Sequence, residues 1–310
     1  MRMQIIDFTE AHAEQAMRLA QAAYEEERAR VPALPDMQVP DLRPFAKNNL
    51  GVAAFEGEEM LGFLCAQGPL KKVFGTTPVR GVWSPVHANA AVGDKARLYH
   101  RMYQAAAQKW VKAGALAHCV TLYAHDEAAK QAWFTYGFGM RCIDAIELIE
   151  ANTPMPEGDF LELPRERAGE VYDLWNALNN HLGDSPCFMR YRSKSRALVA
   201  KTFTRARVFT ARREGEVVAY MKIRDNGETF ASHAPDMMHV CGASALPEVR
   251  GTGLYANLLR YAEATLAKEG YARLGVDYES FNPTALYFYP KHFDVYTNSL
   301  VRRIDERGSR

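Results

Sequence analysis

The sequence of 310 residues lacks any apolar run that approaches the roughly 20 residues needed for a membrane-spanning helix. It also lacks an excess of charge of one sign, because 38 Lys and Arg stand against 37 Asp and Glu, giving a formal net charge of +1. This balance argues against a globally basic nucleic-acid binder and leaves only local patches for polyanions. The hydrophobic share of 48% is enough for a large buried core, and the length predicts two domains.

Cysteine is scarce. The five cysteines are scattered, odd in number and never spaced as C-x-x-C: Cys65, Cys119, Cys142, Cys187 and Cys241. This pattern indicates neither a disulfide framework nor a metal knuckle, and the His and Asp residues form no recurring ligand set, so we expect no metal. The first ten residues, MRMQIIDFTE, turn acidic too early for a signal peptide. We therefore expect a protein of the reducing cytoplasm, with no membrane partner.

The sequence does contain a diverged internal repeat. Gly114 and Gly270 each precede a polar residue by twelve positions, and an alanine and an aromatic residue follow three and seven positions after that. The matching pairs are Asp126 and Asn282, Ala129 and Ala285, and Trp133 and Tyr289. Upstream, the segments 55–64 and 213–223 both carry Glu-Gly-Glu between apolar runs, which is a hairpin signal. The turn-rich segment 150–159 predicts a boundary between domains 1–151 and 152–310.

Each half predicts the order helix, hairpin, strand, helix, strand, helix, strand. In the first half the expected helices cover 10–30, 96–114 and 127–136, with strands at 118–124 and 141–149. In the second half, 166–182 is expected to form the first helix and 253–270 the central one. The predicted fold class is α+β, with a mixed, twisted sheet in each domain and helices on both faces.

A glycine-rich turn opens the central helix of the second half. Arg250, Gly251, Thr252 and Gly253 separate a strand at 239–249 from a helix that starts near Leu254. Such a turn exposes backbone N–H groups, backed by the positive end of the helix dipole, and the missing Cβ atoms let a pyrophosphate approach. A turn with no ligand is the alternative, since the pattern is neither a P-loop nor G-x-G-x-x-G.

These motifs and their order resemble the GNAT acetyltransferase superfamily, over both halves of the chain. The family opens its central helix with Arg/Gln-x-x-Gly-x-Gly/Ala, which Arg250 and Gly253 match, while Tyr255 replaces the last small residue. Its downstream pattern, Asn-x-x-Ala-x-x-aromatic-Tyr, is met by Asn282, Ala285, Phe288 and Tyr289. We expect Tyr255 to crowd one wall of the turn, and Pro290 to end or kink the last helix immediately after Tyr289.

The resemblance implies an acetyl-CoA-dependent N-acetyltransferase of tandem GNAT type, with the active site in the carboxy-terminal domain. It assigns the grip on the coenzyme A pyrophosphate to five residues: Arg250, Gly251, Thr252, Gly253 and Leu254. It implies that Asn282 touches the pantetheine arm, that backbone N–H groups near 241–245 polarise the carbonyl, and that Tyr289 protonates the sulfur. For Tyr289, the alternative is a core aromatic.

The first half departs from this pattern at the corresponding positions. Opposite the glycine turn stand Asp94, Lys95, Ala96 and Arg97, and opposite Tyr289 stands Trp133. We therefore expect this half to keep the fold but to lack both the glycine turn that binds the pyrophosphate, here called the cradle, and a tyrosine that can act as the acid. It would then be a structural or substrate-shaping partner.

Two carboxylates are candidates for the general base. Asp277 and Glu279 lie two residues apart and therefore on one face of a strand, where they could take the amine proton directly or through water. A solvated or salt-bridged strand end is the alternative. His239, with His233 and Asp236 nearby, could read the substrate, and the alternative is a hydrogen-bonded structural histidine.

A basic stretch at 190–213 carries nine Lys and Arg and no acid. A solvated helix face explains it, as does attraction of anionic substrate or coenzyme phosphates. Nucleic acid is disfavoured, because no aromatic interleaving accompanies the charge.

The acceptor is expected to be a small-molecule or peptide amine. The rival function is a non-catalytic coenzyme A-binding or regulatory module. Neither the acceptor nor the oligomeric state can be read from the sequence.

Overall fold

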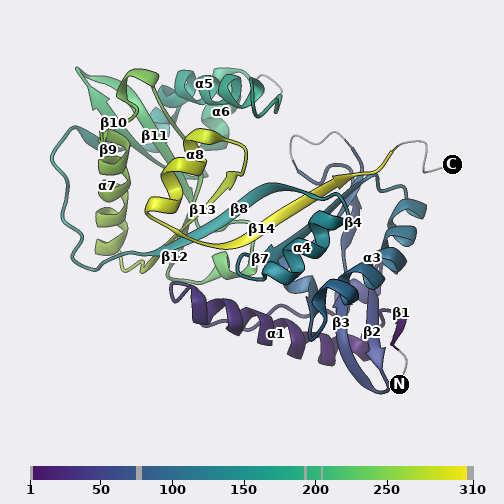
Figure 1. Ribbon diagram of the computed structural model, residues 1–310. Helices are drawn as coiled ribbons and strands as arrows, with labels where there is room; N and C mark the ends of the chain where they lie inside the picture. Colours follow the sequence, from purple (N-terminus) through teal and green to yellow (C-terminus); the bar gives the residue numbers. More distant parts are fainter. Residues whose placement is uncertain (1–2, 75–78, 192–193, 204, 306–310) are drawn as a thin grey trace. The chain divides into compact units, whose positions relative to one another are not determined.

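The computed structural model describes residues 3–74, 79–191, 194–203 and 205–305 (Figure 1). Contacts divide the chain into two compact units, Met1–Asp144 with Val295–Arg310, and Ala145–Asp294. The last strand, β14 (Asp294–Arg303), pairs antiparallel with β7 (Ala117–Tyr123) of the first unit. From Val295 onward this strand belongs to the first compact unit, whereas the expected second domain included it. The boundary at 151/152 stays a prediction. Within the described residues, no helix combines the length and apolarity needed to span a bilayer.

The first unit contains two sheets, with the strand orders β1-β2-β3-β6 and β4-β5-β7-β14. Its other strands are β1 (Gln4–Asp7), β2 (Val52–Glu56), β3 (Glu59–Leu64), β4 (Gln67–Leu70), β5 (Gly81–Ser84), β6 (Asn89–Ala91) and the first part of β8 (Gly139–Leu148). Its helices are α1 (Ala13–Arg30), α2 (Arg43–Ala46), α3 (Lys95–Lys112) and α4 (Glu127–Thr135).

Helices cover both faces of β2. Val52 and Ala54 belong to the core cluster that contains Leu98 of α3, whereas Ala53 belongs to the cluster that contains Ala16 of α1. Successive side chains of a strand point to opposite faces, so the two helices cover opposite sides of this sheet.

The second unit carries a mixed sheet. β9 (Phe160–Glu162), β10 (Arg207–Arg213), β11 (Glu216–Arg224) and β12 (Met237–Ala245) pair antiparallel in that order, and β13 (Arg273–Glu279) pairs parallel with β12. The helices are α5 (Tyr172–Gly183), α6 (Arg196–Phe203), α7 (Leu254–Lys268) and α8 (Pro283–Phe288). Figure 1 shows α5 and α7 on opposite sides of β11, and both helices contact this strand. The helix expected at 166–182 is a 3₁₀ helix up to Val171 and α-helical from Tyr172.

The internal repeat is confirmed by the register of the parallel ladders. In the first unit Gly81 pairs with Ala117 and Trp83 with Cys119, and in the second Met237 pairs with Arg273 and His239 with Gly275. Each residue of the second ladder lies as far along the sequence from its counterpart in the first ladder as Gly270 lies from Gly114. The expected hairpins are also present, as β2 with β3 and β10 with β11. In the second, Glu214 and Gly215 both adopt positive φ angles, as a tight hairpin turn requires.

Candidate active site

Strand β12 turns away from β13 halfway along its length. The parallel ladder covers Met237–Val240 and Arg273–Val276, while β12 stays paired with β11 as far as Ala245. On β11, Ile223 pairs with Val240 and Lys222 with Gly242, so Cys241 is the extra residue of a bulge. A bulge bends its strand, and here it coincides with the end of the parallel ladder. Backbone groups of 241–245 on the β13 side are thereby left outside that ladder.

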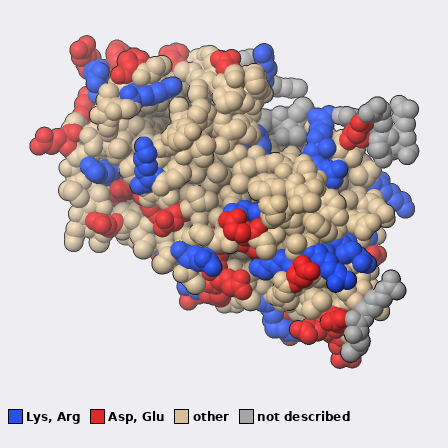
Figure 2. Space-filling view, viewed as in Figure 1, with Lys and Arg blue, Asp and Glu red and all other residues tan. Residues whose placement is uncertain are grey.

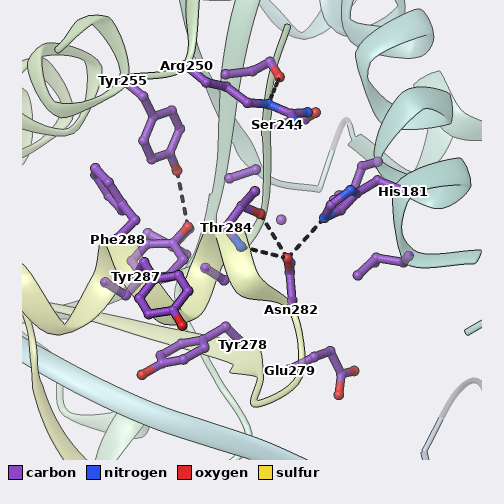
Figure 3. A pocket seen from close by; sticks show the side chains of 18 of the residues that line it. His181, Ser244, Arg250, Tyr255, Tyr278, Glu279, Asn282, Thr284, Tyr287 and Phe288 are labelled. Atoms are coloured by element: carbon purple, nitrogen blue, oxygen red, sulfur yellow. Dashed lines mark hydrogen bonds between the residues drawn. The ribbon is translucent and has the colours of Figure 1, made fainter. Parts of the chain in front are cut away.

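A cavity of about 460 Å³ opens at this divergence, within the second unit. The walls include 241–245 of β12, 277–279 of β13 and three groups expected to act in the site, Arg250, Asn282 and Tyr289. Figure 3 shows Arg250 from the turn before α7, His181 from α5 and Thr284 from α8 around this space. The structure thus brings together residues that lie far apart in the sequence.

The glycine turn has the backbone conformation that its sequence predicts. Gly251 and Gly253 have φ angles of 75° and 85°, a left-handed region that favours glycine, and Gly253 is the N-cap of α7. A Cβ at either position would meet no protein atom within 4 Å, so the space beside the turn is open. Arg250 Nε donates to the Ala245 carbonyl at 3.0 Å, and Thr252 Oγ1 donates to the Val249 carbonyl at 2.7 Å. Arg250 and Gly251 line the cavity, whereas Thr252, Gly253 and Leu254 form the turn and helix start behind them.

Asn282 is the N-cap of α8 and has little exposed surface. Its Oδ1 accepts hydrogen bonds from the Thr284 hydroxyl at 2.8 Å and the Thr284 backbone N–H at 3.3 Å, and it lies 3.0 Å from Nε2 of His181 on α5 (Figure 3). With Oδ1 held in this way, the amide Nδ2 is the group that remains to donate to a ligand. No local motif indicates His181, because it lies 101 residues from Asn282 on another helix.

Tyr289 lies at the wall of the cavity with only 7% of its surface exposed. Its ring stacks on Tyr278 with centroids 5.4 Å apart, and its hydroxyl lies 3.1 Å from the hydroxyl of Tyr255. Burial raises the pKa of Tyr289 to about 12, so the side chain is a protonated phenol at neutral pH. The α-helix ends at Phe288, one residue earlier than expected, and Tyr289 starts a 3₁₀ turn with Pro290. Tyr289 keeps helical dihedral angles, but Pro290 has no backbone N–H to continue the α-helical hydrogen bonds, which explains the early end.

Asp277 lines the cavity and is held from behind by His239, a residue with no exposed surface. The distance from His239 Nε2 to Asp277 Oδ1 is 2.9 Å. The imidazole is closely enclosed, because a Cβ at Gly227 would lie 2.5 Å from its Cε1 and one at Gly275 would lie 2.7 Å from its Nδ1. The two glycines therefore make room for the ring that fixes the carboxylate. Asp277 and His239 thus form a hydrogen-bonded pair, whereas the sequence suggested them only as two separate candidates.

The other candidates from the sequence have different positions. Glu279 lines the same cavity from the end of β13. His233 ends a short 3₁₀ helix and Asp236 forms an ion pair with Arg273, and neither is among the described residues that line the cavity. The structural alternative for these two residues therefore fits better than a role in substrate reading.

In the first unit, side chains fill the corresponding region. β5 ends at Ser84, a 3₁₀ helix follows, and β6 pairs with β3 instead. Asn89 donates to Ser84 Oγ and to the Thr121 carbonyl, and accepts from the Tyr99 hydroxyl at 3.1 Å. Asp94 caps α3 with its own carboxylate, which accepts from the Arg97 N–H at 3.1 Å. The helix start that would bind an anion is thus occupied by an acidic side chain, and Trp133, opposite Tyr289 in the repeat, is fully buried.

Arginines of the basic stretch form ion pairs with acidic residues from outside it. Arg196 pairs with Asp173 at 2.9 Å, and Arg207 pairs with both Glu162 and Glu269 at 2.7 and 2.6 Å. Three of its residues, at positions 192–193 and 204, lie outside the described part of the chain. Figure 2 shows Lys and Arg interspersed with Asp and Glu over the face in view. These ion pairs favour the structural interpretation of the stretch.

Over the described residues, no three His, Cys, Asp or Glu side chains converge as metal ligands.

Residues 171–294 match the sequence profile of the acetyltransferase (GNAT) family. The chain contains a GNAT acetyltransferase domain. This match covers the glycine turn, both strands of the divergence and Tyr289, and it places the chain in the acyltransferase class. A search of curated proteins gives no match.

Solved structures share the fold of the GNAT domain and of its repeat partner. A GCN5-related N-acetyltransferase from Sphaerobacter thermophilus aligns with a TM-score of 0.55 and 13% identity, over 97% of this chain and 95% of that chain. The glucosamine N-acetyltransferase region of a fungal multi-domain β-N-acetylglucosaminidase aligns with a TM-score of 0.51 and 11% identity, over 97% of this chain and 38% of that one. At these identities the likeness shows the fold alone. It confirms the predicted α+β class with two GNAT-like halves.

Proposed function

We propose that the chain transfers the acetyl group of acetyl-CoA to an amine, with its active site in the second unit. The observation that carries this proposal is the divergence of β12 from β13 into a cavity bordered by Arg250, Asp277 and Tyr289. Acetyl transfer requires a held cofactor, a polarised carbonyl, a deprotonated amine and a protonated leaving sulfur. The residues around this cavity can supply each of these.

The turn before α7 fits a pyrophosphate. The open space beside Gly251 and Gly253 lets an anion reach the backbone N–H groups, and the amino-terminal end of the 15-residue helix α7 adds a favourable dipole. Arg250 adds a positive charge at the cavity wall. Asn282, whose Oδ1 is already satisfied, can donate Nδ2–H to an amide carbonyl of the pantetheine arm.

The reacting groups would meet where the strands part. Backbone N–H groups of 241–245 can donate to the acetyl carbonyl and stabilise the charge that develops on its oxygen. Asp277, oriented by His239, takes the proton from the amine, and Tyr289 gives its hydroxyl proton to the departing sulfur. Glu279 at the same wall is the second candidate for the base.

The acceptor is proposed to be a small-molecule or peptide amine. A fixed concentration of the protein with acetyl-CoA and a panel of amines should release free thiol with at least one amine, and the product should carry the acetyl group by mass spectrometry. The rival function, a non-catalytic coenzyme A-binding module, would instead give coenzyme A binding in calorimetry with no thiol release for any amine. The cytoplasmic location stays a prediction.

Gly251→Asp is expected to weaken acetyl-CoA binding by roughly 10²-fold, because a carboxylate beside the turn repels the pyrophosphate and blocks its N–H contacts. The matched control is Gly251→Asn, which has nearly the same size without the charge and tolerates positive φ better than most residues. Calorimetry should therefore give a smaller loss for Asn than for Asp. Equal affinities for the wild type and the Asp variant, with the fold intact by circular dichroism, would place the cofactor elsewhere.

Titration with coenzyme A is expected to give one site per chain. The first unit caps α3 with Asp94 and fills its strand break with Asn89 and Tyr99, so it offers no equivalent turn. Calorimetry of the full chain measures the stoichiometry directly. A value of two would show that the first unit has kept a binding site despite these side chains.

A further inference from the structure

Tyr255 stands at the position where the GNAT motif has a small residue, and its hydroxyl faces the proposed acid. Its Oη lies 3.1 Å from Oη of Tyr289, and both side chains line the cavity (Figure 3). Its ring packs edge-on against Phe288, with centroids 4.9 Å apart and an interplanar angle of 70°. Tyr255, which was expected to crowd the turn, is thus directed from the start of α7 toward Tyr289.

The chemistry of Tyr289 decides the direction of this hydrogen bond. Two hydroxyls at this distance share one hydrogen bond, and either can be the donor. If Tyr289 is to direct its proton at the sulfur, it cannot also donate to Tyr255, so Tyr255 must donate to Tyr289 Oη. This hydrogen bond becomes charge-assisted once Tyr289 has lost its proton. Burial raises the pKa of Tyr289, and the hydrogen bond from Tyr255 acts in the opposite direction.

We propose that Tyr255 is a positioning residue, which donates a hydrogen bond to Tyr289 Oη, directs the Tyr289 hydroxyl at the sulfur, and stabilises the phenolate left after proton transfer. The proposal rests on the acetyl transfer proposed above. In that reaction the amine nitrogen bonds to the acetyl carbon, the carbon–sulfur bond breaks with its electron pair on sulfur, and the Tyr289 proton passes to the sulfur. The proton lost by the amine goes to Asp277. Exchange with solvent restores both side chains after the products leave.

The first unit offers an internal comparison. Tyr99 occupies the position equivalent to Tyr255, and Trp133 the position equivalent to Tyr289. With no hydroxyl at Trp133, the Tyr99 hydroxyl donates to Asn89 instead, and the two rings lie 5.6 Å apart. Both repeats therefore keep a tyrosine at this helix position. Only the second unit gives it a phenol as partner.

The test begins with Tyr255→Phe, which keeps the ring and its contact with Phe288 but removes the hydroxyl. We expect kcat to fall roughly 10- to 100-fold, the effect of losing a hydrogen bond to a charged oxygen, with KM for acetyl-CoA nearly unchanged. Tyr261→Phe is the matched control on the same helix, since Tyr261 stacks on Phe160 away from the cavity lining, and it should keep wild-type kcat.

A double-mutant cycle decides whether Tyr255 acts through Tyr289. In a Tyr289→Phe background, Tyr255→Phe should lower kcat no further, and the two hydroxyl deletions should also be non-additive in the free energy of unfolding by urea. An equal fall of kcat in both backgrounds, additive losses of stability, or wild-type kcat in Tyr255→Phe would each overturn the proposal. A wild-type chain that releases no thiol with any amine overturns the proposed function itself. The stability cycle needs no turnover, and it separates the two failures.

Discussion

Tyr289→Phe is expected to lower the turnover number by roughly 10²–10⁴-fold while acetyl-CoA binding changes little. The variant keeps the ring that stacks on Tyr278 and loses only the hydroxyl. A departing thiolate, with a conjugate acid of pKa about 8.5, must gain a proton at neutral pH. The buried phenol holds its proton there, because burial raises the pKa of Tyr289 to about 12.

Single-turnover measurements isolate the chemical step, and calorimetry reports binding separately. Since Tyr289 is proposed to act in its protonated form, the wild-type rate should fall as the pH rises toward about 12, within the range in which circular dichroism shows a folded chain. Tyr289→Phe should lack this decline. The control is Tyr287→Phe, a neighbouring tyrosine that is 71% exposed. If Tyr287→Phe loses the activity and Tyr289→Phe keeps it, Tyr287, which also lines the cavity, supplies the proton instead. If neither change matters, water or another residue supplies the proton.

Asp277→Asn is expected to cause a loss of similar size, roughly 10²–10⁴-fold in turnover, because an amide cannot take the amine proton. The amide oxygen can still accept from His239 Nε2, so the position of the side chain is kept and only its basicity is removed. Acetyl-CoA affinity should be nearly unchanged, since the proposed pyrophosphate site lies at the turn before α7.

The comparison with Glu279→Gln assigns the base. Both carboxylates line the cavity, but Asp277 is fixed by a fully buried histidine. We therefore expect Glu279→Gln to retain most of the turnover. A large loss in Glu279→Gln with near-normal turnover in Asp277→Asn would reverse the assignment, and normal turnover in both would indicate that the amine arrives already deprotonated.

Local patterns in the sequence were sufficient to predict the helices and strands and the conformation of the glycine turn. The left-handed conformations of Gly251 and Gly253 and the start of α7 depend on residues within a few positions of one another, so the pattern predicts them directly. The alternation of apolar side chains likewise predicts strands and hairpins, and the internal repeat predicts two similar halves. Asp94 at the equivalent position predicts that the first half has no cradle, and the structure shows the Asp94 carboxylate capping α3.

Only the tertiary structure decided which side chains act on one another. His239 and Asp277 are 38 residues apart, Tyr255 and Tyr289 are 34 apart, and His181 and Asn282 are 101 apart. The pairing of β14 with β7 of the first unit also joins segments that are distant along the chain. Spacing along the sequence determines local backbone geometry. Whether two remote side chains come within hydrogen-bonding distance depends instead on strand register and helix packing, which the whole core determines together.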